Sequence, residues 1–439
     1  MKLALLALTA TAFGATEPDW TKAEDEALGL LQQYLRIQSV NPPADTRQAA
    51  MFFERQLKAA GLEPKLLSGQ PEAGKTNLVV RLPGRDRSKR PVLLLNHFDV
   101  GPVDAKMWSV DPFAGIVKDG FIWGRGALDM KGIGIMHLMS MILMKRHGVA
   151  PPRDIVMLTT CDEETNGTWG IEWMADHHWR EIDAEYVLDE GGFGTREILA
   201  PGKLVFGVAA AEKVVVWLRI RATGTAAHGS QPIPDNANER LIQALGRALA
   251  SDGKGKPNPL VETMRRNVGG EMAVNKYTNA IQKNTMSLTT LRAGVGDPPK
   301  TNVIPSVAEA TIDCRLLPGT NVEEFISEMR ARINDPKVTI ELISRPADPG
   351  VSRYDTPMFA AIERAIKRFH PEAIVTPILV PHGTDSVKLR KRGLLGYGLT
   401  PMILDLATAG TMHSDQERIP VDEFKKGLRI FFDLLRSDY

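Results

Sequence analysis

One stretch of the sequence, Val92–Gly132, constrains the fold more than any other. It opens with the apolar run Val92–Leu95, which predicts a short buried strand, and His97 and Asp99 follow closely after it. In open α/β sheets, ligands gather outside the carboxyl ends of the strands. An imidazole and a carboxylate at that edge suit a divalent metal such as zinc, and Asp129 supplies a further carboxylate. Taken singly, each residue has a structural explanation, as a buried core histidine or, for Asp129, as a helix N-cap.

Two more apolar runs downstream end in acidic residues. Asp154–Thr160 predicts a buried strand, and the neighbouring carboxylates Glu163 and Glu164 follow it. Tyr186–Leu188 predicts a brief strand that runs into Asp189. A solvated loop is the structural alternative for the glutamate pair, but it does not explain two adjacent charges so soon after an apolar strand. Helical spacing between the strands completes an alternation of strand and helix, which indicates an α/β layered fold.

A change in the sequence pattern near residue 212 predicts a second domain. A chain of 439 residues exceeds the size at which one core usually keeps growing. The long alternating strand Val214–Gly224 is followed by a helix, two strands, a helix and a strand, which is the split βαβ or ferredoxin-like order. We therefore predict a catalytic α/β domain with a mostly parallel central sheet at 16–211 and 346–439. An inserted ferredoxin-like lid or dimerisation domain at 212–345 would interrupt it, with a return hinge at Arg345–Gly350.

The charges of the chain argue against some partners. The net charge is +1, and acidic and basic residues are interspersed, so nothing indicates binding to nucleic acid or to an anionic membrane. The two cysteines, Cys161 and Cys314, lie in apolar runs and are expected to be small buried residues, not a disulfide framework.

The N-terminus has a composition of its own. Lys2 precedes a short apolar run that ends in small residues, which predicts a secretory signal peptide at 1–15. A plain N-terminal strand is the alternative. The run is too short to span a bilayer, and no later segment is predicted to cross a membrane. A signal peptide implies a periplasmic or secreted protein.

Nine short motifs, each weak by itself, together resemble one family of enzymes. They are HFDV (97–100), GRGALDMKG (124–132), CDEET (161–165), LDEGG (188–192), AAHGSQP (226–232), TNVIPS (301–306), DCRL (313–316), GTDS (383–386) and MHSDQERIP (412–420). In this order they resemble the dinuclear zinc peptidases, which include aminoacylase, glutamate carboxypeptidase, carnosinase-type dipeptidases, acetylornithine deacetylase and succinyl-diaminopimelate desuccinylase. The resemblance covers nearly all of the chain after the predicted signal peptide.

The resemblance implies a set of metal ligands and a catalytic base. The implied ligands are His97, Asp129, Glu164, Asp189 and His413. Asp129 would bridge two Zn²⁺ ions, with Co²⁺ or Mn²⁺ as alternatives, and a cis peptide bond would follow it. One ion would add Glu164 and His413, and the other would add His97 and Asp189. Glu163 would act as the general base, and Asp99 would orient the imidazole of His97.

The resemblance also implies roles for three residues of the inserted domain. His228 would reach across a homodimer interface, formed by the inserted domain, and stabilise the oxyanion in the partner's site. Asn302 and Arg315 would hold the carbonyl and the free carboxylate of the substrate. The structural alternatives are a turn histidine for His228 and a surface residue on an alternating strand for Arg315. His382 departs from the family pattern, which often has glycine there, and we assign it no catalytic role.

These features favour a secreted zinc-dependent hydrolase of amide bonds in small substrates that carry a free carboxylate. Carboxypeptidase, dipeptidase and N-acyl-amino-acid hydrolase activities all fit, with a small peptide or N-acyl amino acid as the substrate. One alternative is a deacylase dedicated to a single metabolite, such as a desuccinylase, although a signal peptide argues against a cytoplasmic biosynthetic role. The other is a non-catalytic binding protein on the same fold, whose expected mark, loss of Glu163 or of a ligand, is absent from the sequence.

Overall fold

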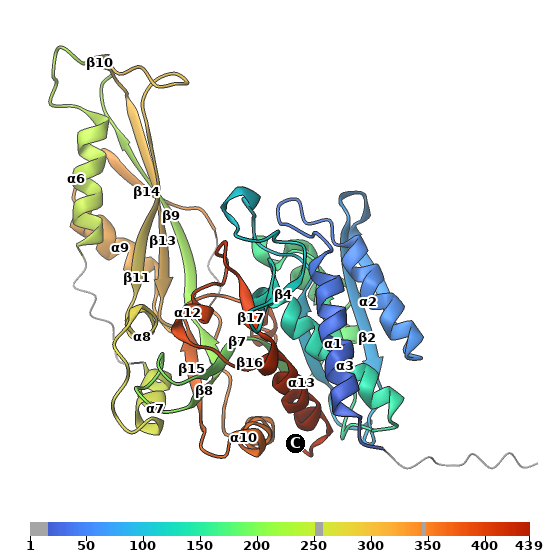
Figure 1. Cartoon of the computed structure of the whole chain (residues 1–439). Coiled ribbons are helices and arrows are strands. Elements are labelled where there is room, and N and C mark those ends of the chain that lie inside the picture. The colour runs from blue at the N-terminus through green and yellow to red at the C-terminus, as the bar shows by residue number, and fades with distance from the viewer. Residues whose placement is uncertain (1–15, 251–257, 345–347) are drawn as a thin grey trace, which may run out of the picture. The chain divides into compact units, whose positions relative to one another are not determined.

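The computed structural model describes residues 16–250, 258–344 and 348–439. The predicted signal peptide and part of the predicted return hinge lie outside these residues. The chain forms two compact units (Figure 1). The first comprises the chain up to Glu185, together with Ala360–Phe369 and Ala407–Tyr439, and the second comprises Tyr186–Phe359 and His370–Leu406. Helices α10 (Pro357–Phe369) and α12 (Leu406–Ala409) include residues of both units.

The first unit surrounds a small sheet with helices. Its helices are α1 (Trp20–Leu35), α2 (Arg47–Ala59), α3 (Gly132–Arg146), α4 (Trp173–His177), α5 (Trp179–Ile182) and α13 (Val421–Arg436), and its shorter turns are η1 (Pro71–Ala73), η2 (Ala105–Met107), η3 (Ala127–Lys131), η4 (Glu163–Thr165) and η5 (Thr168–Glu172). Its strands are β1 (Lys65–Gln70), β2 (Lys75–Leu82), β3 (Val92–His97), β4 (Ile116–Lys118), β5 (Phe121–Trp123), β6 (Ile155–Thr160) and β17 (Arg418–Pro420). Four of these strands lie in the order β1-β2-β6-β3, and β17-β5-β4 form a separate small sheet.

The pairing of β3 with β6 places two predicted site segments at one sheet edge. The two strands are parallel, and His97 at the end of β3 is in register with Thr160 at the end of β6. Every residue of both strands is buried, as their apolar sequences predict. The turn η4, which carries Glu163 and Glu164, therefore starts just beyond the same edge at which His97 lies.

Helix α3 is the central helix of the first unit. All its residues from Gly132 to Met144 are buried, so its methionines pack in the core, as predicted. With the preceding turn, Ala127–Arg146 is the one described helix long and apolar enough to cross a membrane, and its apolar part is buried inside the protein. We interpret it as a core helix for that reason.

The second unit contains two four-stranded arrays and the short two-stranded sheet β10-β12. Its strands are β7 (Tyr186–Thr195), β8 (Val205–Glu212), β9 (Val214–Thr223), β10 (Ala227–His228), β11 (Thr285–Ala293), β12 (Val303–Ile304), β13 (Val307–Leu316), β14 (Val338–Leu342), β15 (Ile374–Val380) and β16 (Leu395–Ile403). Its helices are α6 (Ala237–Leu249), α7 (Pro259–Asn267), α8 (Lys276–Ile281), α9 (Val322–Ile333) and α11 (Ser386–Arg390). One array has the order β7-β16-β8-β15, with parallel pairing of β7 with β16 and of β8 with β15.

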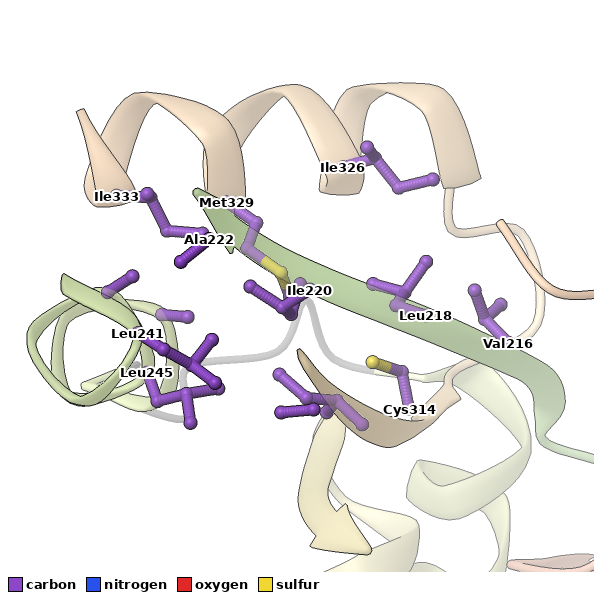
Figure 2. Close-up of a cluster of buried hydrophobic side chains, with 14 of the residues drawn as sticks. Val216, Leu218, Ile220, Ala222, Leu241, Leu245, Cys314, Ile326, Met329 and Ile333 are labelled. Carbon is purple, nitrogen blue, oxygen red and sulfur yellow. The ribbon is translucent and has the colours of Figure 1, made fainter. Parts of the chain in front are cut away.

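The other four-stranded array of this unit has the predicted ferredoxin-like order. Its strands lie as β11-β13-β9-β14 and are antiparallel, and α6 and α9 supply the helices of the pattern. Burial alternates along β9 and β13, because one face of each strand is turned to the helices. Figure 2 shows this core, in which Leu218 and Ile220 of β9 belong to one buried cluster with Leu241 of α6 and Met329 of α9. Cys314 belongs to the same core, and both cysteines are buried and neither forms a disulfide bond.

The predicted fold class, an α/β protein with an additional ferredoxin-like part, is confirmed. The domain boundaries drawn from the sequence stay a prediction. Helices α7 and α8 are an addition to the predicted elements. Although they lie between α6 and β11 in the sequence, they pack their apolar residues, such as Leu260 and Met264, on β8 and β15 and not on the ferredoxin-like sheet.

Candidate metal centre

Three predicted ligands converge in the first unit. Asp129 lies in the turn η3 before α3, Glu164 lies in η4 after β6, and His413 comes from the loop before β17. Nε2 of His413 is 3.0 Å from Oδ2 of Asp129 and 3.3 Å from Oε1 of Glu164. The potential ligand atoms of all three lie within 4.8 Å of one another. This is the convergence of an imidazole and two acids from distant parts of the chain that the motif order predicts.

A second histidine reaches the other oxygen of Asp129. Nε2 of His97 lies 3.2 Å from Oδ1 of Asp129, whereas His413 faces Oδ2 of the same carboxylate. His97 and Glu163 also offer ligand atoms within 4.8 Å of each other. The two oxygens of Asp129 thus face two different histidines, which is the arrangement that a bridging carboxylate requires. The peptide bond between Asp129 and Met130 is cis, as predicted.

Asp99 serves the site differently from the role expected of it. Nδ1 of His97 lies 2.8 Å from the backbone carbonyl of Asp99, while the carboxylate is 3.6 Å away, beyond hydrogen-bond distance. The carboxylate instead accepts the backbone N–H groups of Glu163 and Glu164, at 3.2 and 3.1 Å, and the side-chain amide of Asn41 at 2.8 Å. Because the backbone carbonyl of Asp99 orients the imidazole of His97, the Asp99 carboxylate is available to hold the turn that carries Glu163 and Glu164.

The electrostatics of the cluster favour a cation. Burial alone would raise the pKa of Asp129, but hydrogen bonds from His413 and His97 outweigh it and hold the pKa well below the ordinary value. Hydrogen bonds to Asp129 and then to Glu164 raise the pKa of the His413 imidazole to about 11. Oε1 of Glu164 is buried, 3.3 Å from Nε2 of His413. Buried carboxylates that gather around one point need a positive charge between them, and neutral imidazoles with carboxylates are zinc donors.

Asp189 belongs to the second unit, where its carboxylate accepts hydrogen bonds from Ser386. Its Oδ2 accepts hydrogen bonds from the backbone N–H of Ser386 at 3.1 Å and from its hydroxyl at 2.7 Å. Burial raises the pKa of Asp189, against the opposing effect of Ser386. Glu190, the next residue of β7, is also buried and projects from the opposite face of the strand. The strand therefore carries two candidate carboxylates, of which the sequence motif singled out Asp189.

His228 and Asn302 lie together in the second unit. Nδ2 of Asn302 is 3.2 Å from Nε2 of His228, and the short strands β10 and β12 pair beside them. Both side chains are exposed. Arg315, near the far end of β13, forms a bidentate ion pair with Asp313 at 2.8 and 3.1 Å. Its flanking residues Cys314 and Leu316 are buried, so Arg315 does lie on the opposite strand face from them, as predicted.

Comparison with known proteins identifies the family of the chain. Residues 93–437 match the model of peptidase family M20/M25/M40. The chain belongs to this family. The resemblance stated from the motifs is thereby confirmed, and the protein is an M20-type hydrolase.

Its M20 relatives extend over almost the whole chain. Aminoacylase-1 of Sus scrofa is 30% identical over 422 residues, which cover 95% of this chain and 96% of that protein. The M20 metallo-carboxypeptidase of Sulfolobus solfataricus has a TM-score of 0.74 at 17% identity, covering 94% of this chain and 99% of that one. A Bacillus subtilis M20 protein, described as a dinuclear metal binding peptidase, has a TM-score of 0.60 at 14% identity and covers 95% and 98%. At these identities the two structures support the fold alone.

Sequence reasoning missed two buried charges beside the predicted metal ligands. Arg125 and Glu417 lie inside the quoted motifs, but neither received a role. Their side chains are 3% and 0% exposed, and they form an ion pair at 2.8 Å. The available signal was only their position, since Arg125 lies four residues before Asp129 and Glu417 lies four residues after His413.

Proposed function

We propose that this protein is a dinuclear metal-dependent amidohydrolase that cleaves N-acyl amino acids and small peptides next to a free carboxylate. The observation that carries the proposal is the position of Asp129, whose two oxygens face His97 and His413 separately. One carboxylate between two histidines suits two cations better than one.

The residues present fit such a centre. Asp129, Glu164 and His413 would hold one cation, and Asp129 and His97 would hold the other. The motif resemblance adds a carboxylate of β7 to the second set. The donor set of imidazole and carboxylate favours zinc, with Co²⁺ or Mn²⁺ as alternatives. Divalent cations bound there would polarise the scissile carbonyl and acidify water.

Glu163 is the proposed general base. It neighbours the ligand Glu164, and the Asp99 carboxylate holds the backbone of both in one turn. One carboxylate can then bind metal while the next takes a proton from the attacking water and delivers it to the leaving amine. His228, supplied by a second subunit, would stabilise the developing oxyanion, and Asn302 and Arg315 would hold the carbonyl and carboxylate of the substrate.

N-acyl amino acids are the first choice of substrate class. The supporting observation is the match to aminoacylase-1, which extends over 95% of this chain. Dipeptides are the second choice, because they present the same amide and the same free carboxylate. We also retain the proposal that residues 1–15 direct export, which N-terminal sequencing of the mature protein would test.

A substrate panel with metal removal tests the function. We expect the purified protein to hydrolyse N-acetyl and longer N-acyl amino acids, to lose activity in a chelator, and to regain it with Zn²⁺. Substrates whose carboxylate is amidated should react poorly. Activity that survives complete metal removal would refute the proposal. Turnover of only one panel member would instead favour a dedicated deacylase, and tight zinc binding without any turnover would favour a binding protein.

A further inference from the structure

The loops that carry Asp129 and His413 are joined by one buried ion pair. Oε2 of Glu417 accepts a hydrogen bond from Nη1 of Arg125 at 2.8 Å. Both residues are far apart in the sequence but adjacent in the first unit, one before η3 and the other before β17. The ring of Trp108 lies 5.4 Å from the Arg125 guanidinium carbon and covers it on one side.

Each member of the pair bonds to the ligand loop of the other. Oε1 of Glu417 accepts the backbone N–H of Leu128 at 2.9 Å and that of Asp129 itself at 3.1 Å. In the other direction, Nη2 of Arg125 donates to the backbone carbonyl of His413 at 3.3 Å. The contacts are therefore crossed: the C-terminal glutamate fixes the bridging aspartate, and the N-terminal arginine fixes the histidine.

His413 has a backbone conformation that needs such support. Its φ is +59°, in the left-handed region that residues other than glycine seldom adopt. Such a conformation persists when the surrounding contacts determine it, and these conformations cluster at functional sites. The hydrogen bond from Arg125 acts on the carbonyl of this very residue.

A buried ion pair is a poor choice for stability alone. Removing two charges from water costs free energy that their attraction recovers only with good geometry and additional hydrogen bonds, and apolar residues of similar volume often serve as well. A charged pair is useful where it positions two functional residues. Its planar guanidinium and its carboxylate can each form hydrogen bonds in two directions at once.

We propose that Arg125 and Glu417 are positioning residues that hold Asp129 and His413 at the separation the metal centre requires. The inference rests on the proposed function, because it assumes that these two residues bind the cation. Neither Arg125 nor Glu417 touches the substrate or the cation. They act through the backbone of the ligands.

Two conservative variants test the pair in the full-length protein. Glu417→Gln removes the charge and sets an amide against the guanidinium, and Arg125→Lys keeps the charge but cannot reach Glu417 and the His413 carbonyl with one planar group. Arg153→Lys is the matched control. That arginine is also buried in the first unit, pairs with Glu185, and donates to the distant backbone carbonyl of Tyr439 at 2.9 Å.

The measurements are Zn²⁺ affinity by competition with a chromophoric chelator, the visible spectrum of the Co²⁺-loaded protein, and kcat and KM at saturating Zn²⁺. We expect both site variants to bind Zn²⁺ about 10–100-fold more weakly, as orienting partners of metal ligands do. Their Co²⁺ spectra should change and kcat should fall while KM changes little. Arg153→Lys should keep the wild-type affinity and spectrum even where its thermal stability falls.

The outcomes separate this inference from the proposed function. If Glu417→Gln and Arg125→Lys lose thermal stability like the control but keep wild-type Zn²⁺ affinity and Co²⁺ spectrum, the pair is structural only and the inference fails. If Glu417→Gln does not fold, Arg125→Lys alone decides, because its effect is predicted at His413. If the wild-type protein itself binds no Zn²⁺ or Co²⁺, both the proposed function and the inference fail.

Discussion

At the scale of single residues, the carboxylates of Glu163 and Glu164 are neighbours with separable roles. Since Glu164 approaches His413 and Glu163 is the proposed base, their glutamine variants should fail differently. We expect Glu163→Gln to lower kcat roughly 10²–10⁴-fold, the usual range for a lost general base, with metal content unchanged. Glu164→Gln should lower the zinc content measured by atomic absorption. Equal zinc loss in both variants would contradict the separate roles.

His137 makes the stability of the first unit depend on pH. It is buried in α3, Nδ2 of Asn96 lies 3.2 Å from its Nδ1, and its ring packs edge-on against Phe431. Burial lowers the pKa of His137 to about 3, below the 6.5 of an exposed histidine. The folded state therefore keeps the ring neutral, whereas the unfolded chain binds a proton as pH falls below 6.5. This contribution to stability is full above pH 6.5 and is lost as pH falls toward 3.

The measurement is a difference between wild type and His137→Gln, whose side chain does not titrate. Urea unfolding in the presence of a chelator would be followed at pH 7.5 and pH 5. Relative to the variant, wild-type protein should lose about 2 kcal/mol of unfolding free energy between the two values, since each pH unit below the unfolded pKa costs about 1.4 kcal/mol. Equal losses in the two proteins would show that His137 titrates normally in the fold.

At the scale of elements, strand β7 presents two neighbouring carboxylates on opposite faces. Because Asp189 already accepts two hydrogen bonds from Ser386, we expect it to hold the loop before α11, and Glu190 to be the β7 carboxylate that binds metal. Glu190→Gln should then reduce bound zinc from two equivalents to one, while Asp189→Asn should mainly lower thermal stability. The reverse result would support the ligand that the sequence motif singled out.

The buried strands could be predicted from their apolar runs. The contacts between side chains and backbone groups of distant segments could not. The strand ending at His97 follows from four apolar residues, and the parallel pairing that brings η4 beside it follows from the α/β pattern. The role of the Asp99 carboxylate could not be predicted from the sequence, because either the carbonyl or the carboxylate of the same residue can orient a histidine. Nor could the Arg125–Glu417 pair, because nothing local indicates which of many charges meet across the chain.

At the scale of the whole molecule, the proposed substrate contacts of one chain lie too far apart for one small substrate. Asn302 precedes β12 and touches His228, whereas Arg315 lies near the opposite end of β13. From Val307 to Arg315 a strand rises about 3.3 Å per residue, a span of about 26 Å. An N-acyl amino acid cannot contact both groups of the same chain. Two chains that exchange His228 and Asn302 would resolve the difficulty, and this argues for the proposed homodimer.

Subunit mixing tests that exchange. Homodimers of Glu163→Gln lack the base in both sites, and homodimers of His228→Ala lack the oxyanion donor in both. In a mixed dimer that shares His228 across the interface, one site combines Glu163 of one chain with His228 of the other and is intact. Equal mixing with full subunit exchange makes half of the dimers mixed, so about one quarter of wild-type activity should return. Mixing without exchange is the control, and sedimentation verifies the dimer. If exchanged mixtures stay inactive, or a fully active monomer sediments, His228 does not act in trans, because only the shared arrangement rebuilds a complete site from two defective chains.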